Sequence, residues 1–233
     1  MKKALLFFVS LSTLIFAQFG SQDSGGKLLL EQKCYDVKYY DIHLDIDPVE
    51  KAIAGFTIIT ATAVTDFQTI IINLDTTFTI YELTQISKNG NETEIPFKRE
   101  NGKVSVTFPG VIKQGEIFSI KISYAGAPRA AKRPPWDDGF IWTKSKGGTD
   151  WVTVTCQGGG ADIWYPCKDH PSDEADSVAT HFTIPSNLVC IGSGKFHSSV
   201  DNKNGTKTWN WFSSTPINNY NVMFYLGPYH AIK

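Results

Sequence analysis

Y-D-I-H-L-D-I-D, residues Tyr40–Asp47, alternates strictly between apolar and polar side chains. A period of two is typical of a β-strand that buries one face and exposes the other. The sequence D-P-V-E-K over 47–51 predicts a turn, and Ala52–Thr65 then predicts a second strand beside the first. His43 occupies a polar position of this pattern, so we interpret it as a surface histidine rather than a metal ligand.

Short segments rich in β-branched and aromatic residues recur along the chain, separated by turn signals such as Asn101-Gly102. Further strands are predicted at Thr69–Leu74, Phe78–Ile86, Lys103–Phe108, Ile117–Tyr124, Val178–Ile184, Leu188–Ile191, Lys207–Phe212 and Asn221–Leu226. No segment with a helical period stands between them. The pattern therefore predicts an all-β fold, a large antiparallel β-sandwich.

The N-terminal residues 1–17 have the features of a secretory signal peptide. Lys2 and Lys3 precede an apolar run, and Ala17 offers a small residue for cleavage. The run is too short to span a bilayer comfortably, and no later run is long enough to do so. We expect an exported protein, periplasmic or extracellular, with a flexible leader over 18–33 and one β domain over 34–233.

Composition excludes some functions. Lys and Arg total 22 against 23 Asp and Glu, a balance without the basic footprint of a nucleic-acid binder. The four cysteines of an exported protein allow up to two disulfides in three connectivities, among which spacing does not choose. A cysteine metal site is disfavoured because the chain has no C-x-x-C pair. A basic loop with Arg129, Lys132 and Arg133 is interpreted as solvated.

Thr155–Ser177 is the irregular stretch, and function tends to reside on loops held by a rigid scaffold. Its three glycines at 158–160 lack the residues of a phosphate-binding loop. Its acidic residues lack the spacing of a calcium loop, so we interpret them as solvated turn charges; they are Asp169, Asp173, Glu174 and Asp176. Cys167 and His170 have no identifiable third group for nucleophilic catalysis.

The same stretch resembles a known family. Gln157 followed by the P-C-x-D-x-P element, formed by Pro166, Cys167, Asp169 and Pro171, is similar to the N-terminal domain of zinc aminopeptidases related to aminopeptidase N. Tyr39–Asp47 resembles the opening strand of that domain. Ser213–Gly227 resembles its closing S-x-x-P-x-x-x-Y-x-x-x-F-x-x-G run. The resemblance covers residues 34–233.

The resemblance implies a saddle-like β domain that covers one side of a catalytic domain. It also implies that Gln157 binds the free α-amino group of a peptide substrate, through a charge-assisted hydrogen bond. Gly158 would ease an unusual backbone at the next peptide bond, although relatives often have Ala there. The implied partner is thus a peptide N-terminus.

Zinc is implied for the full-length enzyme only. The zinc motif H-E-x-x-H is missing, because none of the five histidines is followed by Glu. We therefore expect a chain that stops before the catalytic domain, has no catalytic residues or metal ligands, and is inactive alone. The alternative is a free-standing secreted β domain that binds a peptide or protein partner without catalysis.

Overall fold

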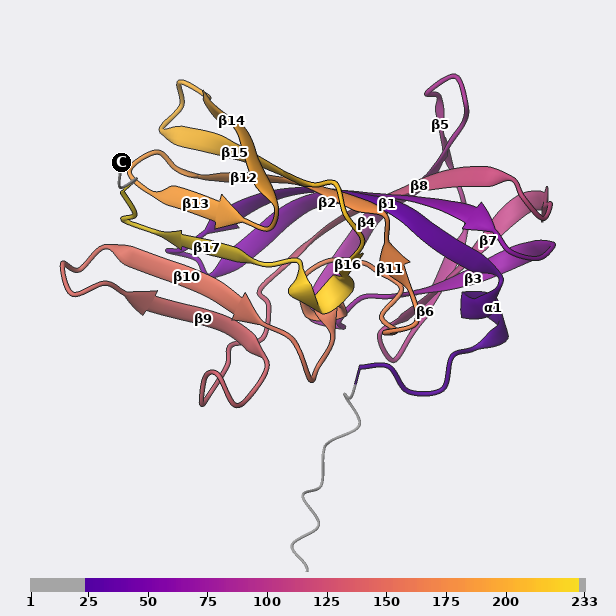
Figure 1. The fold of residues 1–233 in the computed structure, drawn as a ribbon, viewed down its shortest axis with the longest axis horizontal. Coiled ribbons are helices and arrows are strands. Elements are labelled where there is room, and N and C mark those ends of the chain that lie inside the picture. Colours follow the sequence, from indigo (N-terminus) through magenta and orange to yellow (C-terminus); the bar gives the residue numbers. More distant parts are fainter. Residues whose placement is uncertain (1–23, 231–233) are drawn as a thin grey trace, which may run out of the picture.

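The computed structural model describes residues 24–230, and within them nearly all regular structure is β (Figure 1). The predicted signal peptide lies outside the described residues. Among the helices of residues 24–230, none has the length and apolar character needed to cross a bilayer. The all-β prediction is confirmed.

The largest sheet has eight strands and runs the length of the molecule (Figure 1). In spatial order its strands are β14 (Lys195–Asp201), β15 (Thr206–Ser213), β12 (Ser177–Pro185), β1 (Tyr35–Asp47), β2 (Ala52–Ala63), β8 (Ile117–Gly126), β4 (Phe78–Ile86) and β5 (Glu92–Glu94).

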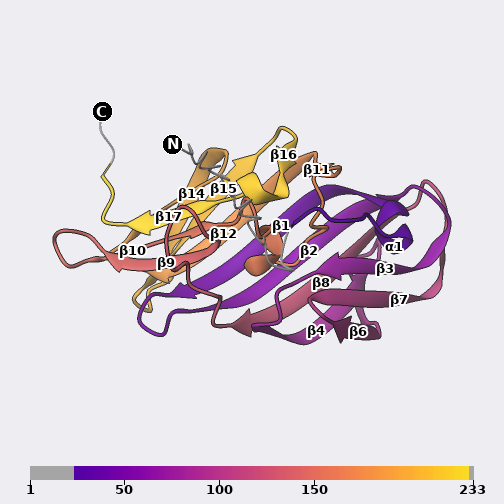
Figure 2. The ribbon, with the colours of Figure 1, turned by 90° about the horizontal axis from the view of Figure 1, so that it is seen from below.

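Three smaller sheets complete the fold. A four-stranded sheet orders β13 (Val189–Gly192), β17 (Phe224–Gly227), β10 (Asp150–Thr155) and β9 (Gly139–Lys144). A three-stranded sheet orders β3 (Phe67–Asn73), β7 (Lys103–Ile112) and β6 (Phe97–Glu100), and β11 (Glu174–Ala175) pairs with β16 (Ile217–Asn218). The short helices are α1 (Leu30–Lys33), η1 (Ala161–Ile163) and η2 (Asn219–Asn221). Figure 2 shows the four-stranded and three-stranded sheets near opposite ends of the molecule.

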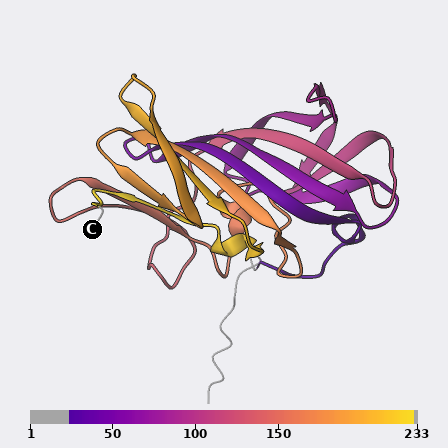
Figure 3. The same cartoon turned by 45° about the horizontal axis from the view of Figure 1, so that its top comes forward.

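β1 shows the predicted alternation, with Tyr40, Ile42 and Leu44 buried and the residues between them more exposed. The strand begins five residues earlier than predicted, because an irregularity between Val37 and Tyr39 shifts the register and hides the period. Its pairing with β12 is parallel, whereas the other pairings of the large sheet are antiparallel. Figure 3 shows orange β12 beside indigo β1.

The core lies between the inner face of the large sheet and the smaller sheets. At one end Phe182 of β12 packs on Phe224 of β17, with ring centroids 5.1 Å apart, and both approach Trp164. At the other end Phe118 of β8 packs edge-on against Phe67 of β3 at 5.4 Å. The contacts of Trp164 with Phe182 and Phe224 anchor the segment after β10 to the core.

Residues 24–33, the end of the predicted leader, contact the domain. Ser24 N–H donates to the carbonyl of Gly158 at 3.0 Å. Gln32 is buried at the end of this segment and donates from Nε2 to Asn73 Oδ1 at 2.9 Å. The segment therefore reaches the irregular stretch that contains the candidate site.

Candidate functional site

β10 ends at Thr155 and is followed by the buried Cys156. Gln157 is the first residue of the turn that comes next. Its side chain is exposed and makes no hydrogen bond to any residue between 24 and 230. The turn itself is held from both sides. Gly158 N–H donates to Asp138 Oδ1 at 3.3 Å, and its carbonyl accepts from Ser24. A fixed backbone thus presents a free amide side chain to solvent.

The unusual backbone expected at Gly158 lies two residues later. The Gln157–Gly158 peptide bond is trans, and of the three consecutive glycines only Gly160 has a positive φ, of 90°. A Cβ on Gly160 would lie 2.1 Å from Asp169 Oδ2. The glycine requirement of this stretch therefore comes from the close approach of Asp169 to the backbone.

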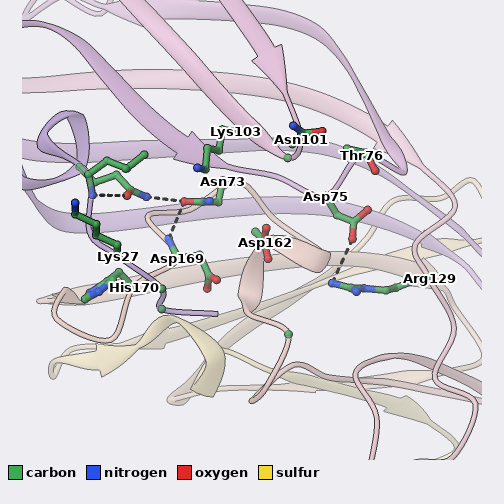
Figure 4. A pocket seen from close by; sticks show the side chains of 16 residues that line it. Lys27, Asn73, Asp75, Thr76, Asn101, Lys103, Arg129, Asp162, Asp169 and His170 are labelled. Carbon is green, nitrogen blue, oxygen red and sulfur yellow. Dashed lines mark hydrogen bonds and ion pairs between the residues drawn. The ribbon is translucent and has the colours of Figure 1, made fainter. Parts of the chain in front are cut away.

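A pocket of about 630 Å³ opens beside the turn (Figure 4). Gly159 and Asp169 line it, whereas Gln157 does not. Arg129 Nη2 lies 3.3 Å from Asp75 Oδ2 at one end. In Figure 4, Asp162 lies between this ion pair and Asp169. Of the predicted site residues, Asp169 lines the pocket, whereas Gln157 and Gly158 lie on the exposed turn.

Pro166, Cys167 and Asp169 of the P-C-x-D-x-P element are buried and serve the fold rather than forming an exposed site. The backbone of Cys167 pairs with Asn73, with N–O distances of 2.8 and 3.0 Å. Asp169 accepts from Ala161 N–H and from Asn219 Nδ2, both at 3.1 Å. Pro166 is buried, while Pro171 is exposed and approaches Gly25. The element joins β3, η1 and η2.

The interpretation of four solvated acidic residues is wrong for two of them. Asp169 and Asp173 are buried, at 9% and 7% exposure, while Glu174 and Asp176 are exposed as expected. Asp173 Oδ2 pairs with Lys168 Nζ at 2.6 Å. This pair was not predicted, because Lys168 occupies the variable position of the P-C-x-D-x-P motif.

Comparison with known proteins decides the family. Residues 36–220 match the family described as the peptidase M1 N-terminal domain. The chain belongs to this family.

The relatives of this M1 N-terminal domain are zinc peptidases. It is 24% identical over 188 residues to leucine aminopeptidase 2 of Vanderwaltozyma polyspora. The aligned region covers 80% of this chain and 27% of that protein. An M1 zinc metallopeptidase of Deinococcus radiodurans matches with 26% identity and a TM-score of 0.71. A mutant of that enzyme bound to a Tyr-Ser-Ala substrate matches with the same identity and TM-score.

The M1 N-terminal domain spans only part of these relatives. The match covers 84% of this chain but 42% of the unliganded Deinococcus enzyme and 43% of its substrate complex. The family prediction is confirmed by the match over residues 36–220, and the chain spans less than half the length of these relatives.

Three carboxyl groups of the M1 domain line the pocket, those of Asp75, Asp162 and Asp169. Burial, together with the nearby Asp169 and Asp75, raises the pKa of Asp162 to about 8. Burial also raises the pKa of Asp169, although Ala161 N–H and the Asn219 amide donate to it. Asp162 Oδ1 is buried and has no hydrogen-bond partner among the described residues. The pocket wall thus favours a neutral Asp162 at neutral pH.

The four cysteines are buried, and none is paired with another. Burial raises the pKa of the Cys167 thiol well above its usual value, which suppresses the reactive thiolate. His170 Nδ1 lies 2.7 Å from Ser172 Oγ. These observations give no support to a Cys167–His170 nucleophile.

The interpretation of a solvated basic loop holds for Lys132 and Arg133, which are exposed. It is wrong for Arg129, whose side chain is 24% exposed and pairs with Asp75. Sequence patterns did not indicate this contact, because Asp75 lies far away along the chain, in the turn that follows β3.

Proposed function

We propose that this chain is the N-terminal domain of an exported zinc aminopeptidase, and that Gln157 binds the free α-amino group of the peptide. The M1 family assignment and the substrate-bound relative support the reaction class. The signal-peptide pattern at residues 1–17 supports export.

The position of Gln157 in the structure supports its proposed role in binding the α-amino group. Asp138 and Ser24 fix the backbone of the turn, and the amide oxygen of Gln157 on it is an exposed acceptor with no internal partner. An ammonium group is the ligand it suits, because the hydrogen bond is charge-assisted. Holding the peptide's first residue at one point positions the first peptide bond for attack.

The 233 residues do not fit the zinc site of the family, because no histidine is followed by Glu. We therefore assign no step of hydrolysis to this chain. The zinc of the proposed enzyme would be held by residues beyond Lys233.

The genomic sequence tests the whole-protein proposal. The reading frame after Lys233 should encode H-E-x-x-H within about the length of one further domain, roughly 100–200 residues. A natural stop codon directly after Lys233 would overturn the enzyme and favour the free-standing binding domain.

Steady-state kinetics of the complete protein tests Gln157 separately. With an aminoacyl substrate, Gln157→Ala should lower kcat/KM by about 10- to 100-fold, which corresponds to a lost hydrogen bond to a charged group of about 1.5–3 kcal/mol. Gln157→Glu should lower KM, because a carboxylate attracts ammonium more strongly. Gln114→Ala, another exposed turn glutamine, is the matched control.

The outcomes are distinguishable. An active enzyme with unchanged kcat/KM in Gln157→Ala refutes the assigned residue alone, whereas a complete protein without aminopeptidase activity refutes the proposed function.

A further inference from the structure

Two histidines and an aspartate meet on the outer face of the large sheet. His43 of β1 and His181 of β12 are directly opposite in the parallel register. Asp41 lies two residues before His43, and residues two apart on a strand share a face. Since Ile42, Leu44 and Phe182 point into the core, the trio faces away from the smaller sheets. The sequence pattern placed His43 correctly on the surface but did not reveal its partners.

The three side chains converge on one point. Nε2 of His43 and Nε2 of His181 each lie 3.0 Å from Asp41 Oδ1. The two imidazole rings stack with centroids 4.1 Å apart, and His43 also stacks on Phe56 at 4.4 Å. Within residues 24–230 this is the only group of three ligating side chains whose atoms lie within 4.8 Å of one another.

The hydrogen bonds around His181 fix its tautomer. Asn210 donates from Nδ2 to Ser198 Oγ at 3.0 Å, which turns its Oδ1 toward His181 Nδ1 at 2.6 Å. An amide oxygen only accepts, so His181 Nδ1 bears the proton. Nε2 is then the ring nitrogen that faces Asp41, and it holds either a proton or a metal ion there.

A 3.0 Å approach of this nitrogen to a carboxylate oxygen requires a proton or a metal ion between the two atoms. Asp41 Oδ1 is itself shielded from solvent and has no hydrogen bond of normal geometry with a described residue. A histidine whose second nitrogen donates to a fixed acceptor is the usual arrangement of a metal ligand.

The geometry points to a binding site for a divalent transition metal at Asp41, His43 and His181, with Asn210 as the positioning residue. Two imidazoles and a carboxylate suit Zn²⁺ and its neighbours rather than Ca²⁺ or Mg²⁺. Side-chain exposures of 22%, 36% and 27% for Asp41, His43 and His181 leave room for water as a further ligand. The two rings stack with their planes 17° apart, so both imidazoles must turn out of the stack about their soft terminal torsions before their lone pairs meet at one ion.

Calorimetric titration of the untagged, chelator-treated chain with Zn²⁺ tests the site. The wild type should bind one equivalent, and Co²⁺ should give visible absorption bands of an imidazole-bound ion. His43→Ala, His181→Ala and Asp41→Asn should each abolish saturable binding. His230→Ala removes an exposed histidine outside the trio and should bind as the wild type does.

Asn210→Ala separates ligation from a merely structural role. This variant keeps all three ligands but loses the acceptor at His181 Nδ1, so Zn²⁺ affinity should fall about 10- to 100-fold. Circular dichroism checks folding, and His181→Gln replaces His181→Ala if the latter unfolds.

Two results overturn the site. One is the absence of Zn²⁺ and Co²⁺ uptake by folded wild type, which would leave a proton in place of the metal. The other is unchanged Zn²⁺ binding in the Asp41→Asn variant and also in one of the two single histidine variants.

Discussion

The turn at Gln157–Gly159 and the segment Pro166–Pro171 lie within one stretch of sequence but have opposite environments. Lys168 and Asp169 are buried, and their charged or polar atoms bond to neighbouring segments. Gln157 is exposed, and its amide has no described partner. The motif that is easiest to recognise therefore stabilises the fold, whereas the single residue beside it remains available to a ligand.

The difference has a physical origin. A buried polar group needs partners to offset its desolvation, so the P-C-x-D-x-P segment is constrained by many neighbours at once. An exposed amide is solvated by water and imposes no such demand. Variants along the stretch should accordingly show a graded loss of stability, steepest in the buried segment.

The largest effect is expected for Lys168→Met. Lys168 Nζ pairs with Asp173 at 2.6 Å and donates to the Tyr35 carbonyl at 2.7 Å, with both side chains of the pair buried. Removing one partner leaves an uncompensated buried charge, so unfolding free energy should fall by about 3–5 kcal/mol in urea denaturation. Adding Asp173→Asn should recover part of the loss. Lys203→Met, from an exposed pair, should leave the midpoint unchanged.

Gly160→Ala should follow. The positive φ alone costs about 1–2 kcal/mol, and the new methyl group must displace the Asp169 carboxylate, which costs about 1–3 kcal/mol more in lost hydrogen bonds. Gly148→Ala has a similar φ, of 82°, with no atom within 4 Å of its Cβ. It should show only the conformational part. Equal losses in the two variants would contradict the role of Asp169.

A pH-dependent effect is expected for Asp162→Asn. Burial raises the pKa of Asp162 to about 8, so the folded protein retains a proton that the unfolded chain releases near pH 4. The wild type should lose stability as the pH rises between these values. The variant should lack this loss, and its Tm advantage should be largest above pH 8. Asp45→Asn, at an exposed position of β1, serves as the control.

The smallest stability effect belongs to Gln157→Ala. An exposed side chain without partners should change unfolding free energy by less than about 0.5 kcal/mol. A loss of several kcal/mol in thermal or urea unfolding would mean that the turn is architectural, and the contrast with Lys168 would disappear.

Much of the fold followed from local pattern. The alternation in Tyr40–Asp47 predicted one buried face, and that face is buried. Two strand starts were predicted less well. β1 begins at Tyr35 rather than Tyr40, because of the irregularity near Lys38, and β17 begins at Phe224 rather than Asn221, because residues 219–221 form η2. A register shift breaks the period on which strand prediction depends, and 3₁₀ turns have no strong period of their own.

The candidate sites divide in the same way. Gln157 was found because it stands at a fixed distance from a recognisable motif within one stretch of chain. The ion pairs of Lys168 with Asp173 and of Arg129 with Asp75 were missed, because the charge of a residue says nothing about its burial.

By itself, the amino-acid sequence determined the all-β class, the family and the residue proposed to meet the substrate. These depend on period, order and spacing along the chain. Only the tertiary structure decided which carboxylates are buried, where glycine is indispensable, and that His43 meets His181 across a parallel pairing of strands more than 130 residues apart. Those properties depend on distances between remote segments, which no local pattern encodes.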